Sequence, residues 1–141
     1  MEVSDSNAED AVWTTIATAD MPEGTDLNLK KTVDVKENGK AREIPRYIRL
    51  YFTSGNSQAA NRSIGVREFQ VIGTKKSESG YETITGNIAL NKTASASGVE
   101  AAMPNLTANL AVDGQKSDTS RWSAPTMKTE LHQISSRPAV A

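Results

Sequence analysis

The stretch from Arg46 to Thr53 constrains the fold more than any other part of the chain. In the order Tyr47-Ile48-Arg49-Leu50-Tyr51-Phe52, polar or amphipathic side chains alternate with purely apolar ones. Because successive side chains of a β-strand point to opposite faces, this period of two places Ile48, Leu50 and Phe52 on one face. That face needs a hydrophobic core against it, so the segment predicts a half-buried strand.

A second strand is predicted over residues 64–73, with a change of phase inside it. Ile64 and Val66 stand at even positions, whereas Phe69 and Val71 stand at odd ones. A β-bulge near Arg67-Glu68 would return them to one face, because a bulge inserts one extra residue into a strand.

The remaining elements are predicted to be short. Trp13–Thr18 and Leu29–Val35 are rich in β-branched residues and predict strands, and Asn38-Gly39 is a dipeptide typical of tight turns. Residues 99–110 predict at most a helical turn, because Pro104 interrupts them. No long amphipathic helix is present, so the sequence predicts an all-β fold.

Composition excludes several classes of protein. The chain has 141 residues, a formal net charge of −1, 37% hydrophobic residues and no cysteine. A near-neutral charge argues against nucleic acid as a partner, and the absence of cysteine excludes a disulfide scaffold and a thiolate zinc site. No apolar run approaches the roughly 18 residues of a membrane helix, and the acidic start of the chain is not an export signal.

Catalysis is not expected either. His132 is the only histidine, and it stands among polar residues that match no motif. No Ser/His/Asp set, metal-binding histidine spacing or phosphate-binding glycine loop is visible. The acidic residues are scattered, and no pair has a spacing that fixes the carboxylate separation of a glycosidase.

Four short motifs point to one family. They are Arg46–Leu50 (RYIRL), Glu68–Val71 (EFQV), Asn87–Ser97 (NIALNKTASAS) and Asp113-Gly114 followed by Ser120–Ser123 (SRWS). Together they resemble the discoidin domain, also called the coagulation factor 5/8 type C domain, whose bacterial members are the family-32 carbohydrate-binding modules. In that family the last two motifs open the domain and the first two close it, whereas here the closing pair comes first.

The resemblance implies a jelly-roll type β-sandwich and a division of the chain. Residues 1–73 would be the C-terminal half of one discoidin-like module, residues 74–86 a linker, and residues 87–141 the N-terminal half of the next module. The middle strands of the family and a match for the last residues, from Lys128 on, are missing. We therefore expect a chain cut from a tandem array, with neighbouring modules as partners and with unpaired sheet edges.

The resemblance also implies a function. We expect a non-catalytic carbohydrate-binding module that is ancillary to a secreted or cell-wall bacterial glycoside hydrolase, and therefore an extracellular location. The partner would be a glycan or polysaccharide. The alternatives are an adhesion module that recognises a protein or membrane surface, and a structural spacer. The loops are rich in Ser, Asn and Gly rather than in apolar residues, which favours sugar over a membrane.

Two sets of site residues follow from the resemblance. A structural calcium ion would be held by Asp113, Asp118, Ser120 and Glu68, although Glu68 belongs to the other copy and Lys116 lies inside the loop. Hard oxygen ligands on a tight loop suit calcium, but an Asx-turn with capping hydrogen bonds is an equally weighted alternative.

The ligand-binding residues would be Asn61 and Arg62, whose amide and guanidinium groups can bond sugar hydroxyls. Trp122 and Trp13 could act as sugar platforms, because aromatic faces stack on pyranose rings. The tryptophan of the Arg-Trp-Ser motif is a core residue in the family, so we expect Trp122 to be buried instead.

Overall fold

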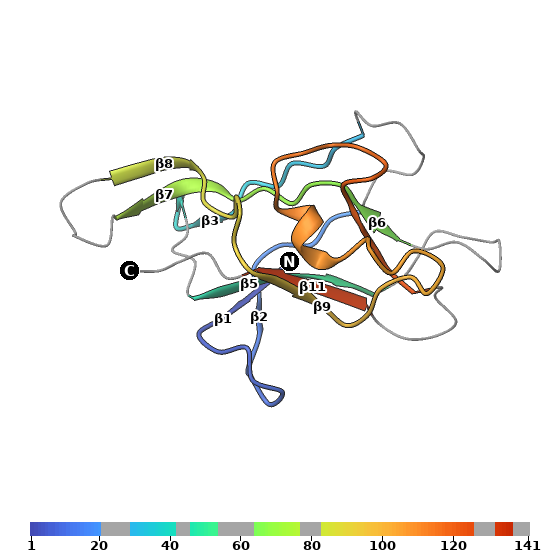
Figure 1. Cartoon of the computed structure of the whole chain (residues 1–141). Helices are drawn as coiled ribbons and strands as arrows, with labels where there is room; N and C mark the ends of the chain where they lie inside the picture. The colour runs from blue at the N-terminus through green and yellow to red at the C-terminus, as the bar shows by residue number, and fades with distance from the viewer. Residues whose placement is uncertain (21–28, 42–45, 54–63, 77–82, 126–131, 137–141) are drawn as a thin grey trace.

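A computed structural model describes residues 1–20, 29–41, 46–53, 64–76, 83–125 and 132–136 (Figure 1). Their regular structure is β-strand, apart from one 3-10 helix, η1 (Ala108–Ala111). The strands are β1 (Glu2–Ser4), β2 (Thr14–Thr15), β3 (Lys36–Glu37), β4 (Lys40–Ala41), β5 (Tyr47–Phe52), β6 (Gly65–Val66), β7 (Ile72–Lys76), β8 (Thr83–Asn87), β9 (Ala94–Ala96), β10 (Trp122–Ser123) and β11 (His132–Ser136). The predicted all-β fold class is confirmed. In this described part no helix is long and apolar enough to cross a bilayer.

The main sheet is antiparallel and has five strands in the order β2-β1-β5-β11-β9. Strand β5 is at its centre and pairs with β1 through Glu2↔Arg49 and with β11 from Phe52↔His132 to Ile48↔Ser136. Strands β1, β2 and β5 come from the first predicted half of the chain, whereas β9 and β11 come from the second. The two halves therefore share one sheet, while their origin in two tandem modules and the jelly-roll topology stay predictions.

The hydrophobic core lies on one face of β5, as its alternation predicts. Ile48 is fully buried, and Leu50 and Phe52 are partly buried against the same core. Trp122 from β10 is fully buried too, and its ring stacks on that of Phe52 with centroids 6.3 Å apart. Its indole Nε1 donates a hydrogen bond to the carbonyl oxygen of Gly98 at 2.9 Å, which satisfies the buried polar atom.

The change of phase after Val66 is resolved by a break in the strand. Strand β6 ends at Val66 and β7 begins at Ile72, and the residues between them belong to no strand. Val66, Phe69 and Val71 are nevertheless all buried in the core. The interruption therefore does what the predicted bulge would have done: it buries the even-numbered Val66 together with the odd-numbered Phe69 and Val71. Within it the Phe69 amide donates to the Ala111 carbonyl at 2.6 Å.

Of the short strands predicted near the N-terminus, one is absent and one is shorter than predicted. No strand forms at Leu29–Val35, where Leu29 and Val33 are exposed, and only Thr14–Thr15 of the Trp13–Thr18 segment is strand. The turn at Asn38-Gly39 is confirmed: it joins β3 to β4, with φ of 52° and 76° at its two residues. A high β-propensity alone does not produce a strand, because a strand also needs a neighbouring strand to pair with.

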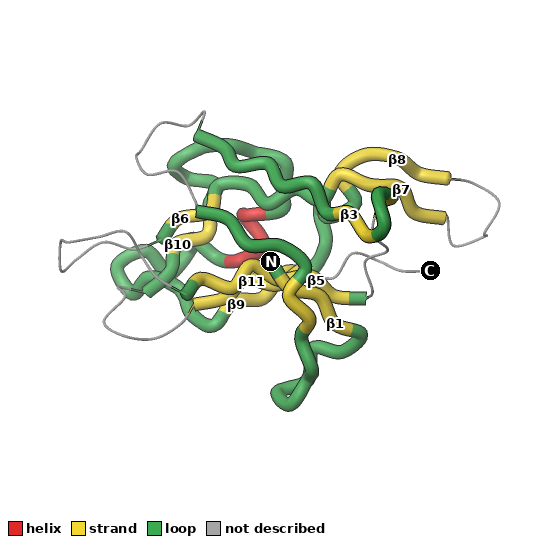
Figure 2. Tube along the Cα trace, turned by 180° about the vertical axis from the view of Figure 1, so that it is seen from behind, coloured by secondary structure: helices red, strands yellow, loops and turns green. Residues whose placement is uncertain are grey.

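Strands also extend into two stretches where none was predicted, residues 74–86 and the tail from Lys128 on. Residues 72–76 and 83–87 form the β7–β8 hairpin, so the stretch proposed as a linker, residues 74–86, contains strand residues. This hairpin projects from one side of the molecule (Figures 1 and 2). In addition, β11 lies in the tail that matched no motif, yet it occupies the place between β5 and β9.

Candidate functional site

The loop after η1 is organised by Asp113. One carboxylate oxygen of Asp113 accepts a hydrogen bond from the backbone amide of Gln115 at 2.8 Å, and the other accepts one from the buried Ser120 hydroxyl. Gly114 between them has a φ of 83°, a left-handed conformation that glycine adopts without strain. The first contact is the Asx-turn that the sequence allowed as an alternative to a metal site.

Glu68 reaches this loop from the other half of the chain. Its Oε2 accepts a hydrogen bond from the Gly114 amide at 3.1 Å, and its Oε1 accepts one from the Asn87 side-chain amide at 3.4 Å. Asn87 is itself oriented, because its Oδ1 accepts hydrogen bonds from the backbone amides of Val71 and Ala89. The fold thus joins Glu68 to the Asp113 loop, 46 residues away along the chain.

This environment disfavours the charged form of Glu68. Partial burial raises the pKa of the Glu68 carboxyl, and the negative charge of Asp113 raises it further. The Gly114 hydrogen bond and the charge of Lys116 act in the opposite direction, but the pKa stays above its ordinary value. The charge of one carboxylate therefore acts on the other across the junction of the two halves.

Asp118 does not join them. Its carboxylate accepts a hydrogen bond from Arg67 Nη2 at 2.8 Å and lies 3.5 Å from Arg121 Nη1. The hydrogen bond from Arg67 lowers the pKa of Asp118, helped by the charges of both arginines. Of the four predicted calcium ligands, Asp113 and Ser120 are thus in direct contact, and Glu68 reaches the amide of Gly114 next to Asp113. Asp118 is paired with the arginines instead. Across the described ranges no three His, Cys, Asp or Glu side chains gather in one metal-binding group.

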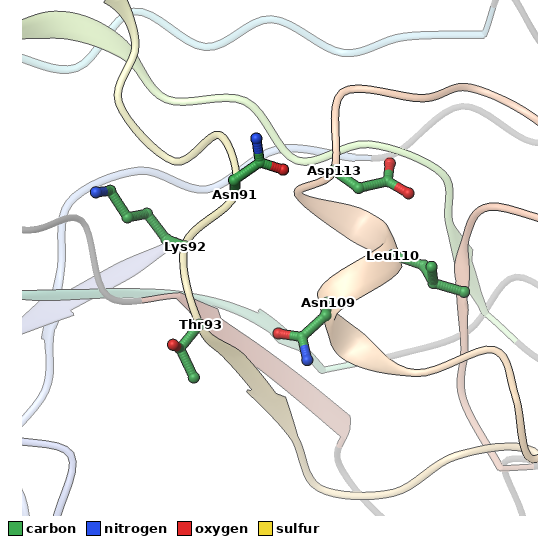
Figure 3. A pocket seen from close by; sticks show the side chains of 6 residues that line it. All are labelled: Asn91, Lys92, Thr93, Asn109, Leu110 and Asp113. Carbon is green, nitrogen blue, oxygen red and sulfur yellow. The ribbon is translucent and has the colours of Figure 1, made fainter.

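An open pocket of about 300 Å³ lies beside Asp113. It is lined by Asn91, Lys92, Thr93, Asn109, Leu110 and Asp113. Figure 3 shows the first three on the segment between β8 and β9, opposite η1, which carries Asn109 and Leu110. The backbone is fixed by the hydrogen bond from the Asn91 amide to the Val112 carbonyl, at 2.7 Å, and by the one from the Ala94 amide to Asn109 Oδ1, at 2.8 Å.

Sequence reasoning missed this pocket. The signal available to it was the Asn91-Lys92-Thr93 motif, but its facing residues on η1 are about 18 positions further on, and only the fold brings them together. The predicted ligand residues, Asn61 and Arg62, lie outside the described residues, so their role stays a prediction.

The rings of Trp122 and Trp13, the two candidate sugar platforms, are both covered at least in part. Trp122 is fully buried, which confirms the expectation of a core residue. Trp13 is partly buried, and the guanidinium of Arg49 lies over its ring at 4.0 Å from the centroid. The face of the indole that Arg49 covers is not available for stacking.

The chain was compared with protein families, with curated proteins and with solved structures. No family model, no curated protein and no solved structure matches this chain.

Proposed function

We propose that the chain is a non-catalytic carbohydrate-binding module, ancillary to a secreted or cell-wall bacterial glycoside hydrolase. The observation that supports this most is the chemistry of the open pocket. The side-chain amides of Asn91 and Asn109 and the hydroxyl of Thr93 can each donate and accept hydrogen bonds, as sugar hydroxyls do. Leu110 adds an apolar surface that can contact the C–H groups of a pyranose ring. The resemblance of the four motifs to carbohydrate-binding modules points in the same direction.

The absence of an acid–base pair in this pocket fits binding rather than hydrolysis. Among the residues that line it, Lys92 and Asp113 are the ionisable ones. Asp113 already accepts two hydrogen bonds, from Gln115 and Ser120. Hydrolysis of a glycoside needs two carboxyl groups that flank the bond, and the lining supplies one. With no aromatic side chain in the lining, we expect weak binding to sugars.

Binding is tested with a variant that changes one donor. Asn109→Asp keeps the acceptor for the Ala94 amide and replaces the side-chain NH₂ with an oxygen, so the fold should persist. Calorimetric titration with galactose, N-acetylglucosamine and their oligomers should give a measurable affinity for the wild type and a loss of about tenfold for the variant, about 1.4 kcal/mol. Asn105→Asp, outside the pocket, is the matched control. Binding to anionic liposomes without a response to any glycan would favour the adhesion alternative.

We also propose a structural calcium ion at the junction of the halves. Glu68 and Asp113 would hold it with Ser120, because these groups are hard oxygen donors and the negative charge of Asp113 acts on Glu68. Asp118 is excluded from the set, because Arg67 and Arg121 already neutralise it. When bound, the ion would neutralise the two carboxylates and link residues far apart in the chain.

Calcium is tested through thermal unfolding. An ion that binds only the folded state stabilises it by about 2.7 kcal/mol at a hundredfold excess over Kd, so chelation should lower the wild-type Tm. Glu68→Gln and Asp113→Asn should abolish the difference between calcium and chelator. Asp118→Asn, in the same loop, should retain it. A calcium response that survives Asp113→Asn would refute this site.

A further inference from the structure

The folded body is built jointly from two stretches of chain, residues 1–76 and 83–136. The pairings β5–β11 and β6–β10 both join one stretch to the other. The same holds for the stacked rings of Phe52 and Trp122 and for the hydrogen bond from the Ala124 amide to the Ile64 carbonyl, at 2.8 Å. The buried core is also divided between them, with Val3 and Ile48 on one side and Val112 and Trp122 on the other. Neither stretch has a complete core alone.

The connection between the two stretches is the β7–β8 hairpin. Its five residue pairs, from Ile72↔Asn87 to Lys76↔Thr83, form a separate two-stranded ladder. The hairpin projects away from the main sheet (Figures 1 and 2). Ile72, Thr74 and Thr85 are exposed on it. The base of the hairpin is joined to the body, because Asn87 is hydrogen-bonded to Val71 and Glu68. Thr74 and Thr85, further along the hairpin, are exposed and take no part in the core.

We propose that two copies of this chain exchange halves at this hairpin. Residues 1–76 of each copy then pair with residues 83–136 of the other, and β7 pairs with the partner's β8. Every contact of the body and every pair of the hairpin is kept in such a dimer; only the closure of the hairpin within one chain is lost. Exchange of identical elements is a low-cost route to dimers for this reason.

The exchange makes the polar junction a shared site. Glu68 and Arg67 belong to the first stretch, whereas Gly114 and Asp118 belong to the second. In the exchanged dimer each of these contacts joins two chains. The proposal concerns assembly, and it does not depend on what the pocket binds.

Thr74 and Thr85 provide the direct test. They are cross-strand partners in the hairpin, and their hydroxyl oxygens are 3.4 Å apart. Since the chain has no cysteine, Thr74→Cys with Thr85→Cys introduces the only two thiols. In a monomer the disulfide forms within one chain, whereas in the exchanged dimer it forms between chains.

The double variant is unfolded, refolded at micromolar and at millimolar concentration, oxidised, and run on a non-reducing gel beside light scattering. We expect cross-linked monomers from the dilute sample and covalent dimers from the concentrated one. The single variant Thr74→Cys gives the background of collisional cross-linking. Cross-linked monomers alone at both concentrations would overturn the proposal, as would a dimer by light scattering whose disulfides remain within each chain.

Complementation gives an independent measurement. Ile48→Asp and Trp122→Asp each place a charge in the buried core, so each variant alone should fail to fold. Refolded together, they can form a dimer in which the intact first stretch of one chain meets the intact second stretch of the other. We expect a cooperative unfolding transition in that mixture and none in a mixture of Ile48→Asp with Val3→Asp, whose changes lie in the same stretch. No transition in either mixture would contradict the exchange.

Discussion

Glu2 and Glu68 are both partly buried glutamates, but in the described part of the chain only Glu2 forms an ion pair with a cationic side chain. Glu2 on β1 lies 2.6 Å from Arg49 Nε on β5, and both side chains are only 15% exposed. It also accepts a hydrogen bond from the Thr15 hydroxyl, at 3.2 Å. Glu68 accepts its two hydrogen bonds from neutral donors, the amide of Gly114 and the side chain of Asn87, and has Asp113 nearby. In the described part of the chain no arginine or lysine forms an ion pair with it.

The difference separates a structural ion pair from an acidic junction. At Glu2 the counter-charge is part of the chain: Arg49 lies over the ring of Trp13 at 4.0 Å and over that of Tyr51 at 5.1 Å, which fixes its position. At Glu68 the carboxylate is held by hydrogen bonds beside a second carboxylate, an arrangement that raises its pKa. A bound cation would supply there what Arg49 supplies at Glu2.

The largest effect is expected at the ion pair. Arg49→Met keeps most of the aliphatic volume but leaves the Glu2 carboxylate without its cation in a largely buried place. We expect a loss of about 2 kcal/mol in the free energy of unfolding, between the values for exposed and fully buried pairs. Urea denaturation measures it, with the exposed Arg46→Met as control. Equal losses in the two variants would remove the distinction between Arg49 and an ordinary surface arginine.

Glu68→Gln should behave in the opposite way. Glutamine retains an acceptor for the Gly114 amide and removes the charge, so stability at pH 7 in the presence of chelator should stay the same or rise by less than about 1 kcal/mol. The side chain is only partly buried, so solvent screens its charge and keeps the gain small. A loss as large as that of Arg49→Met would show that the charge of Glu68 is stabilising, and would refute the proposed difference between Glu68 and Glu2.

The pH dependence of the same variant sharpens this result. The pKa of Glu68 is raised above its ordinary value of 4.5, so the folded state binds the proton more tightly than the unfolded state. The wild type therefore loses stability as pH rises from 4.5 through the raised pKa, and the loss is constant above it. Glu68→Gln lacks this contribution, so the two denaturation curves should coincide near pH 4 and separate toward pH 7. Curves that separate only below pH 4 would contradict the sign.

Asp118→Asn should have the smallest effect. The hydrogen bond from Arg67 lowers the pKa of Asp118 below its ordinary value of 3.8, so its contribution is present at neutral pH and is lost as pH falls through the lowered pKa. Asp118 is 72% exposed, and solvent and salt screen its charge. We expect a small decrease in Tm at low salt that disappears at high salt. A decrease that persists at high salt would indicate a structural role.

Local physical chemistry made several features predictable from the sequence. The alternation in β5 requires one apolar face, so Ile48 points into the core in any sheet that contains this strand. The Asn38-Gly39 turn follows from residues that tolerate positive φ. The Asx-turn at Asp113 needs only an aspartate and the amide two residues later. The core position of Trp122 was expected instead from the motif resemblance.

Other features depend on partners that are distant in the sequence. Residues 132–136 carry a single aliphatic residue, Ile134, yet they form β11 because β5 and β9 offer edges on both sides. Asn91 and Asn109 line one pocket because η1 faces the segment before β9.

Asp113 and Asp118 show the same division within one loop. As residues of a polar, glycine-containing turn, both are equally plausible metal ligands, and the sequence treats them alike. The tertiary structure separates them. Glu68 accepts a hydrogen bond from Gly114, next to Asp113 and 46 residues away, whereas Arg67 donates one to Asp118, 51 residues away. The sequence alone determined the strand faces and the local turns, since these depend on neighbouring residues and on the backbone. Which aspartate keeps an acidic neighbour and which is neutralised by arginine was decided only by the fold, because charges act through space and not along the chain.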